Sequence, residues 1–168
     1  MSGPDIAALD ARAATLGQLL LAKHRHVVTA ESCTGGWIAQ SITAIAGSSD
    51  WFDRGYVTYS NAAKMDMLGV AAGTLADHGA VSGETAGEMA AGALAAAGAD
   101  IAVAVTGVAG PAGGSAEKPV GTVWFGWCLG EQPPITRCCR FDGDRQRVRE
   151  QTVAVALDGL IELLETGG

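Results

Sequence analysis

The chain has 168 residues, of which 48% are apolar and 17% charged, a composition far from the low-hydrophobicity, high-charge range of disordered proteins. A chain of this length buries roughly 70% of the surface that its unfolded form exposes, so it needs neither disulfides nor a structural metal, and we expect one domain over residues 1–168. Acidic residues outnumber basic ones, 18 against 11, for a net charge of −7, which disfavours nucleic acid and anionic membranes as partners.

The N-terminal part of the chain alternates helical and extended patterns. Apolar residues spaced three and four apart from Ile6 onward predict a helix that ends near Lys23. A short β-branched run over residues 26–30 predicts a buried strand. The sequence Glu-Ser-Cys-Thr-Gly-Gly at 31–36 then predicts a turn, with a second helix that begins near Thr34.

The middle of the chain continues this alternation. Residues 55–60 predict a second strand, after which Asn61 is expected to cap a short helix that carries Lys64. Ser82 is expected to cap an alanine-rich helix over residues 83–97, whose small side chains allow close packing. That small-residue face suits either internal packing or a homo-oligomer contact.

The last third of the chain predicts a reversal of strand direction. Residues 100–106 form an apolar run typical of a strand that is buried on both faces. Residues 120–129 and 134–141 predict two strands joined by a tight turn, which makes them antiparallel, and a final helix follows Asp144. The predicted fold class is therefore α/β, a three-layer α/β/α sandwich with a mixed, mostly parallel sheet.

Ser32 is the first candidate for chemistry, because it lies where a predicted strand ends and a helix follows, facing the crevice that open α/β sheets use for ligands. A serine there could act as a nucleophile, and free backbone N–H groups of the helix could stabilise an oxyanion or hold a phosphate. Gly35 and Gly36 permit close approach of a ligand. The alternative is that Ser32 only caps the helix. Cys33 is a rival nucleophile, but we interpret it as a small buried apolar residue.

Tyr59 and Lys64 form the second candidate. A tyrosine at a strand end and a lysine one short turn later could converge on the same crevice as Ser32. Lys64 can serve as a base for serine only if desolvation or a nearby cation lowers its pKa from about 10.4 towards neutrality. The alternatives are an ordinary solvated lysine and a half-buried strand tyrosine.

A glycine-rich loop and an arginine are the third candidate. Residues 106–114 follow a predicted strand and include four glycines, so their amides could cradle a phosphate, although the spacing matches neither the P-loop nor the dinucleotide fingerprint. A flexible surface loop is the alternative. Arg145 lies near a helix start, where the helix dipole favours an acid, so it indicates an anionic partner. An ion pair with Asp142 or Asp144 would explain it equally.

The remaining motifs argue against a membrane protein and against a metal site. No basic leader and no apolar segment of membrane-spanning length is present, so we expect a cytoplasmic protein. The cysteines lack a C-x-x-C spacing and are interpreted as reduced packing residues, and the histidines lack partners at ligand spacing. These residues are Cys33, Cys128, Cys138, Cys139, His24, His26 and His78.

Taken together, the motifs resemble those of the CinA C-terminal family. The resemblance rests on residues 31–36, Tyr59-Ser60-Asn61 with Lys64, residues 106–114, 118–121 and 143–145, and it extends in order from Thr15 to Leu164. Val108 stands where isoleucine is common in the family, which is a conservative change. Members of the family include nicotinamide mononucleotide deamidases.

The resemblance implies hydrolysis of nicotinamide mononucleotide to nicotinate mononucleotide and ammonia, which returns a pyridine nucleotide to NAD synthesis without a cofactor. On this sequence, Ser32 would attack the carboxamide, and Lys64 and Tyr59 would move its proton. The remaining site residues would bind this small-molecule nucleotide, with Arg145 meeting its phosphate. They are Thr34, Gly35, Gly36, Thr106, Gly107, Gly110, Gly113 and Arg145. The alternative function is a nucleotide-binding partner module of the same fold without catalysis.

Overall fold

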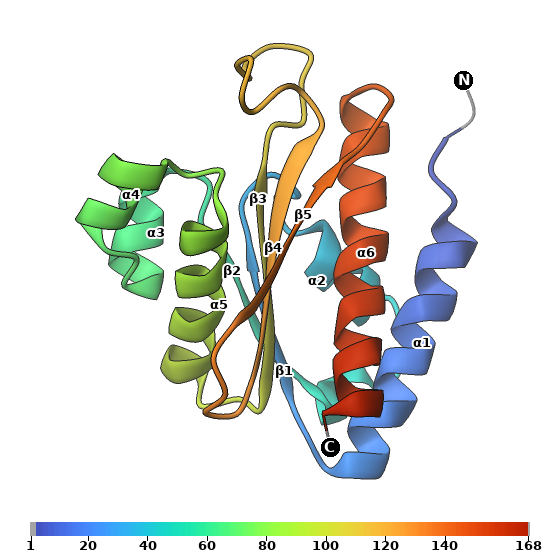
Figure 1. The fold of residues 1–168 in the computed structure, drawn as a ribbon. Coiled ribbons are helices and arrows are strands. Elements are labelled where there is room, and N and C mark those ends of the chain that lie inside the picture. Colours follow the sequence, from blue (N-terminus) through green and yellow to red (C-terminus); the bar gives the residue numbers. More distant parts are fainter. Residues whose placement is uncertain (1–2, 168) are drawn as a thin grey trace.

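A computed structural model of the chain describes residues 3–167. Figure 1 shows a twisted sheet with helices on both of its faces. In chain order the elements are α1 (Ile6–Lys23), β1 (Val27–Glu31), α2 (Trp37–Thr43), the 3-10 turn η1 (Ser48–Asp50), β2 (Phe52–Val57), α3 (Asn61–Leu68), α4 (Ala72–His78), α5 (Gly83–Ala97), β3 (Ile101–Gly107), β4 (Thr122–Leu129), β5 (Ile135–Arg140) and α6 (Arg145–Thr166).

The sheet is mixed, with strand order β2-β1-β3-β4-β5. β1 pairs in parallel with β2 and with β3, whereas β4 pairs antiparallel with β3 and with β5. Within residues 3–167, β4 is therefore the one strand that runs against the other four. β1 is buried at every position and β3 at all but its last, as the continuous apolar runs predicted. The predicted α/β/α sandwich with a mixed, mostly parallel sheet is confirmed.

The two faces of the sheet are covered differently. α6 packs on β3 and β4, α2 packs on β1 and β2, and α1 packs on α6 and α2. This side holds large side chains, including the stacked rings of Phe125 and Trp127, whose centroids are 5.4 Å apart. The predicted apolar stripe of α1 is buried there from Leu9 to Leu20, although Ile6 at its start is exposed.

The other face is covered by α5, with α3 and α4 outside it. α5 comes so close to β4 that a Cβ on Gly126 would lie 2.4 Å from the carbonyl oxygen of Ala86. Only glycine allows that approach. The small-residue face of α5 therefore packs internally against the sheet.

Several predicted boundaries move. α2 begins at Trp37 rather than near Thr34, because Gly35 and Gly36 adopt positive φ angles of 60° and 104° and extend the turn. The N-cap of α3 is Ser60, whose Oγ accepts from the N–H of Ala63, so the prediction of Asn61 as the cap was wrong.

One predicted strand is shifted, one helix was not predicted, and the starts of two other helices agree with the prediction. The predicted strand 55–60 lies instead at 52–57, and α4 has no counterpart in the prediction. Ser82 caps α5 as expected, and α6 follows Asp144, which is its N-cap; each side chain accepts from a backbone N–H three residues on.

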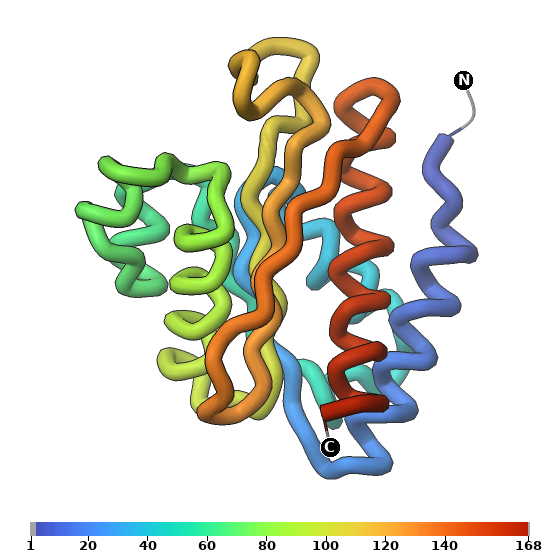
Figure 2. The backbone as a smooth tube through the Cα atoms, in the orientation of Figure 1, coloured from blue at the N-terminus to red at the C-terminus, as the bar shows by residue number. Residues whose placement is uncertain are grey.

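The carboxyl ends of β1, β2 and β3 meet at one edge of the sheet, since these strands run in the same direction. Figure 2 shows the loop between β3 and β4 extending beyond this edge. No helix within residues 3–167 combines the length and apolar character needed to cross a membrane.

Candidate active site

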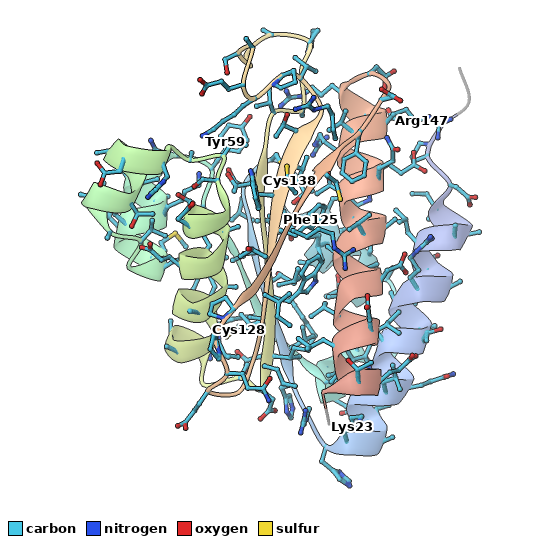
Figure 3. The ribbon with its side chains drawn as sticks, viewed as in Figure 1. Lys23, Tyr59, Phe125, Cys128, Cys138 and Arg147 are labelled. Carbon is cyan, nitrogen blue, oxygen red and sulfur yellow. The ribbon has the colours of Figure 1, made fainter. Side chains whose placement is uncertain are left out.

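A cleft of about 340 Å³ opens at the carboxyl ends of β1 and β3, the position where open α/β sheets bind ligands. Figure 3 shows Tyr59 close to this edge, below the loop that follows β3, whereas Cys128 lies toward the opposite edge. Segments far apart in the sequence line the cleft, namely Ser32, Cys33, Tyr59, Asn61, Lys64, Ala80, Val81, residues 106–110, residues 112–114 and Arg145.

Ser32 and Lys64 meet at the bottom of this cleft. Ser32 follows the last residue of β1, and Lys64 lies one turn into α3, 32 positions later in the chain. The Lys64 Nζ lies 3.1 Å from the Ser32 Oγ, and only 1% of Lys64 is exposed. Lys64 is therefore not a solvated surface lysine, and Ser32 is not a helix cap, since the N-cap of α2 is Gly36.

The surroundings of the Lys64 amine orient its hydrogens. Nζ donates to the carbonyl oxygens of Thr58 at 3.2 Å and Tyr59 at 3.5 Å. Carbonyls only accept, so in the neutral amine they take its two hydrogens. The remaining lone pair then points to the third neighbour, the Ser32 Oγ, which is the arrangement that a base for this hydroxyl requires.

Burial also favours the neutral form of this amine. Desolvation lowers the pKa of Lys64 from its ordinary value, and the neighbouring Cys33 opposes this effect more weakly. No carboxylate among residues 3–167 forms a salt bridge with Lys64. The amine thus lies where a proton can be accepted and returned.

Cys33 borders the cleft but is poorly suited to nucleophilic attack. Its side chain belongs to the apolar core on the α6 face, and burial raises the pKa of its thiol to about 12. A thiol of that kind stays protonated at neutral pH. This supports the sequence-based choice of Ser32 over Cys33.

The turn after β1 is held by two charged residues that sequence reasoning did not identify. The Glu31 carboxylate accepts from the Thr34 hydroxyl at 2.5 Å and from the backbone N–H groups of Ile38 and Ala39. Desolvation raises the pKa of Glu31, and these donors oppose the rise. From α6, Arg149 donates to the carbonyl oxygens of Cys33 and Thr34 at 3.1 and 2.9 Å.

The predicted substrate-binding residues divide into two groups. Thr106, Gly107, Gly110, Gly113 and Arg145 line the cleft. The other three, which are Thr34, Gly35 and Gly36, lie outside that lining and shape the turn behind Ser32. The Thr106 hydroxyl donates to the Ala80 carbonyl at 2.9 Å, which leaves its oxygen free to accept from a ligand.

Arg145 and Tyr59 meet at the mouth of the cleft. The Arg145 guanidinium donates to the Gly110 carbonyl at 2.8 Å and lies 3.3 Å from the Tyr59 hydroxyl. No ion pair links Arg145 to an acid within residues 3–167, so the alternative of a pair with Asp142 or Asp144 is wrong. The Tyr59 hydroxyl is engaged with Arg145, and it is the Tyr59 carbonyl that contacts Lys64.

Across residues 3–167, no three His, Cys, Asp or Glu side chains gather in a way that could hold a metal ion. The four cysteines are free, as expected. Cys33 and Cys128 are buried, but Cys138 is exposed, so its prediction as a packing residue was wrong. The polar groups that line the cleft include the Ser32 hydroxyl, the buried Lys64 amine and the Arg145 guanidinium at its mouth.

Comparison with known proteins identifies the family of the chain. The family model of the CinA C-terminal domain matches residues 9–164. The chain belongs to the CinA C-terminal domain family. Curated CinA relatives include the nicotinamide-nucleotide amidohydrolase PncC of Escherichia coli strain K12, 59% identical over 86% of this chain and 88% of that protein. The PncC protein of Pseudomonas putida is 56% identical over 90% of this chain and 94% of that protein.

Solved CinA structures have the same fold. Competence damage-inducible protein A of Klebsiella pneumoniae subsp. pneumoniae MGH 78578 matches with a TM-score of 0.92 and 43% identity, covering 95% of this chain and 99% of that chain. The competence/damage inducible protein CihA of Agrobacterium tumefaciens matches with a TM-score of 0.91 and 47% identity, covering 97% of this chain and 98% of that chain. The match to the family model begins at residue 9, slightly before Thr15, where the resemblance in sequence motifs was expected to begin.

Proposed function

We propose that this CinA-family chain is a nicotinamide-nucleotide amidase, a single-domain cytoplasmic enzyme that converts nicotinamide mononucleotide and water to nicotinate mononucleotide and ammonia. The observation that carries the proposal is the buried contact of 3.1 Å between the Lys64 Nζ and the Ser32 Oγ, with two carbonyls placed to accept both hydrogens of the neutral amine. The names of the PncC relatives supply the substrate class. The product would return to NAD synthesis.

In the first half-reaction, the Ser32 Oγ attacks the carboxamide carbon while its proton passes to the Lys64 Nζ. The carbonyl oxygen becomes an oxyanion, which N–H groups of the turn after β1 can stabilise. The C–N bond then breaks, and the leaving nitrogen takes the proton from Lys64 to depart as ammonia. The acyl group of the mononucleotide is left bound to Ser32 as an ester.

In the second half-reaction, water attacks this ester and Lys64 accepts the water proton. The C–O bond to Ser32 breaks, and the Ser32 Oγ recovers its proton from Lys64. The acid product ionises in solution. Dividing the hydrolysis in this way lets one amine act alternately as base and acid, so no cofactor is consumed.

Recognition of the nucleotide requires local positive potential, because the chain carries a net charge of −7. Arg145 at the mouth of the cleft provides a cation, and Gly110 and Gly113 leave the loop backbone accessible to a phosphate. Thr106 can accept from the substrate within the cleft. Tyr59, bonded to Arg145, would support phosphate binding.

The test is ammonia release from nicotinamide mononucleotide by the purified wild type and by two single variants. We expect Ser32→Ala to lower kcat by at least about 10³-fold, since removal of a nucleophile eliminates the covalent route, while calorimetry shows retained substrate binding. Cys33→Ala is the matched control and should keep wild-type kcat. An inactive Cys33→Ala with an active Ser32→Ala would identify the thiol as nucleophile. Binding without ammonia release by the wild type would favour the non-catalytic module.

A further inference from the structure

Most of the backbone N–H groups around Ser32 donate a hydrogen bond within residues 3–167, but some do not. Ser32 donates to the Val105 carbonyl and Gly35 donates to the Ser32 carbonyl. Further along, Trp37 donates to the Thr34 carbonyl, and Glu31 takes the N–H groups of Gly36, Ile38 and Ala39, which completes this part of the turn.

The N–H groups of Cys33 and Thr34 are the exceptions. Between Ser32 and Ala39, these two donate to no oxygen within the described part of the chain, although Cys33 is 6% exposed and Thr34 is fully buried. Buried backbone donors are almost always paired. Thr34 lies outside the cleft lining, whereas Cys33 borders the cleft beside the candidate nucleophile, so its N–H, which has no oxygen acceptor in residues 3–167, points to an acceptor that the substrate brings.

Arg149 determines which way one of these donors faces. Its Nε holds the Cys33 carbonyl, which belongs to the same peptide unit as the N–H of Thr34. In a planar trans peptide the C=O and N–H bonds point in opposite directions. The carbonyl points towards Arg149 on α6, so the N–H of Thr34 points away from that side chain and the peptide plane after Cys33 is fixed.

The neighbouring peptide unit is fixed in a similar way. The Ser32 carbonyl accepts from Gly35, which directs the N–H of Cys33 away from that bond. A second Arg149 nitrogen holds the Thr34 carbonyl at 2.9 Å, and the guanidinium lies over the Trp37 ring at 5.5 Å. The planar fork of arginine reaches both carbonyls at once, which a lysine amine does not reproduce.

We propose that Arg149 is a positioning residue for the amidase, one that holds the turn after β1 so that the N–H group of Cys33 faces the carboxamide oxygen attacked by Ser32. The inference rests on the proposed function. Arg149 itself does not touch the substrate. It acts through the backbone, so its loss should weaken stabilisation of the oxyanion more than binding of the ground state.

The experiment measures steady-state ammonia release by Arg149→Met, Arg149→Lys and the matched control Arg147→Met. Arg147 lies on the same helix, two residues away, outside the cleft lining. We expect Arg149→Met to lower kcat by about 10- to 100-fold, the scale of loss for a misplaced catalytic group, with KM changed less than about threefold. Arg149→Lys should recover part of this loss, and Arg147→Met should keep wild-type kcat.

The pH profile separates positioning from a direct effect of charge. If Arg149 acted through its charge on Lys64, its removal would shift the midpoint at which kcat rises, and full activity would return at higher pH. We expect an unchanged midpoint and a kcat that stays low across the profile. A shifted midpoint with recovered activity overturns the inference.

Folding and the proposed function are controlled separately. Thermal unfolding gives the folded fraction of each variant, and if Arg149→Met does not fold, Arg149→Lys decides: wild-type kcat in that variant overturns the inference. Equal kcat for wild type and a folded Arg149→Met overturns it as well and leaves the amidase proposal standing. No ammonia release by the wild type defeats both.

Discussion

The half of the cleft built from β1 and α3 is buried, with Ser32 8% and Lys64 1% exposed, whereas the half at the mouth faces solvent, with Tyr59 63% exposed. Each half contains one cation and one hydroxyl in contact, Lys64 with Ser32 and Arg145 with Tyr59. The two pairs have similar chemical groups and different surroundings.

This difference separates chemistry from recognition. In the buried half, desolvation lowers the pKa of Lys64, so the amine can become neutral and accept a proton. In the exposed half, Arg145 stays charged and hydrated, which suits binding of an anion. Changes in the buried half should therefore act on kcat and changes in the exposed half on substrate preference, with smaller effects because solvent screens exposed charges.

The largest effect is expected from a variant that keeps the positive charge at Lys64 and removes its ability to act as a base. Arginine is not deprotonated at working pH, so we expect Lys64→Arg to lower kcat by about 10²- to 10⁴-fold, the usual contribution of a general base. Wild-type kcat should rise with pH through the lowered pKa of Lys64, because the neutral amine is the active form. An active Lys64→Arg enzyme would reduce the role of Lys64 to electrostatics.

The second prediction concerns stability. The folded state binds the Lys64 proton less tightly than the unfolded state, because the folded pKa is lowered, so between the lowered and the ordinary pKa the unfolded chain holds more protons. The free energy of unfolding of the wild type, measured relative to Lys64→Met, should therefore rise with pH across that window, by at most about 1.4 kcal/mol per pH unit.

This contribution is fully present above the ordinary lysine pKa and is lost as pH falls through the lowered one. Urea denaturation of both proteins over a range of alkaline and neutral pH gives the difference. A difference that is independent of pH would show that Lys64 is not desolvated in the folded protein.

In the exposed half, Arg145→Ala tests recognition. Charge-assisted hydrogen bonds contribute about 1.5–3 kcal/mol, but Arg145 is exposed, so we expect a loss near the lower end, roughly tenfold in kcat/KM for the mononucleotide. Nicotinamide riboside lacks the phosphate, and its slower hydrolysis should change little. Equal losses on both substrates would instead place Arg145 in the scaffold, through its bond to the Gly110 carbonyl.

The smallest effect is expected from Tyr59→Phe, which tests whether the Tyr59 hydroxyl acts in binding or in proton transfer. Its hydroxyl contacts the Arg145 guanidinium at the solvent-exposed mouth, where solvent weakens the bond, so Tyr59→Phe should raise KM by about two- to fivefold with kcat retained. Steady-state kinetics with the mononucleotide measures both constants. A fall in kcat comparable to that of Lys64→Arg would restore Tyr59 to the proton-transfer step that the family resemblance implied.

Local patterns accounted for most of the fold. The order of the strands, the burial of β1 and β3, the cap at Ser82 and the start of α6 after Asp144 all follow from hydrophobic periodicity and short-range hydrogen bonding. Boundaries moved where glycine decided the backbone, as at the start of α2, and α4 was missed because its seven residues include none that is buried.

What the sequence determined by itself was the placement of Ser32, Lys64 and the glycine loop after strands and turns, because those signals lie within a few neighbouring residues. Only the tertiary structure decided that Lys64 is buried against Ser32, that the Tyr59 hydroxyl contacts Arg145, and that Arg149 holds a turn 115 positions away. Desolvation and long-range hydrogen bonds depend on which surfaces come into contact when the sheet and its helices assemble. Local sequence patterns do not predict those contacts.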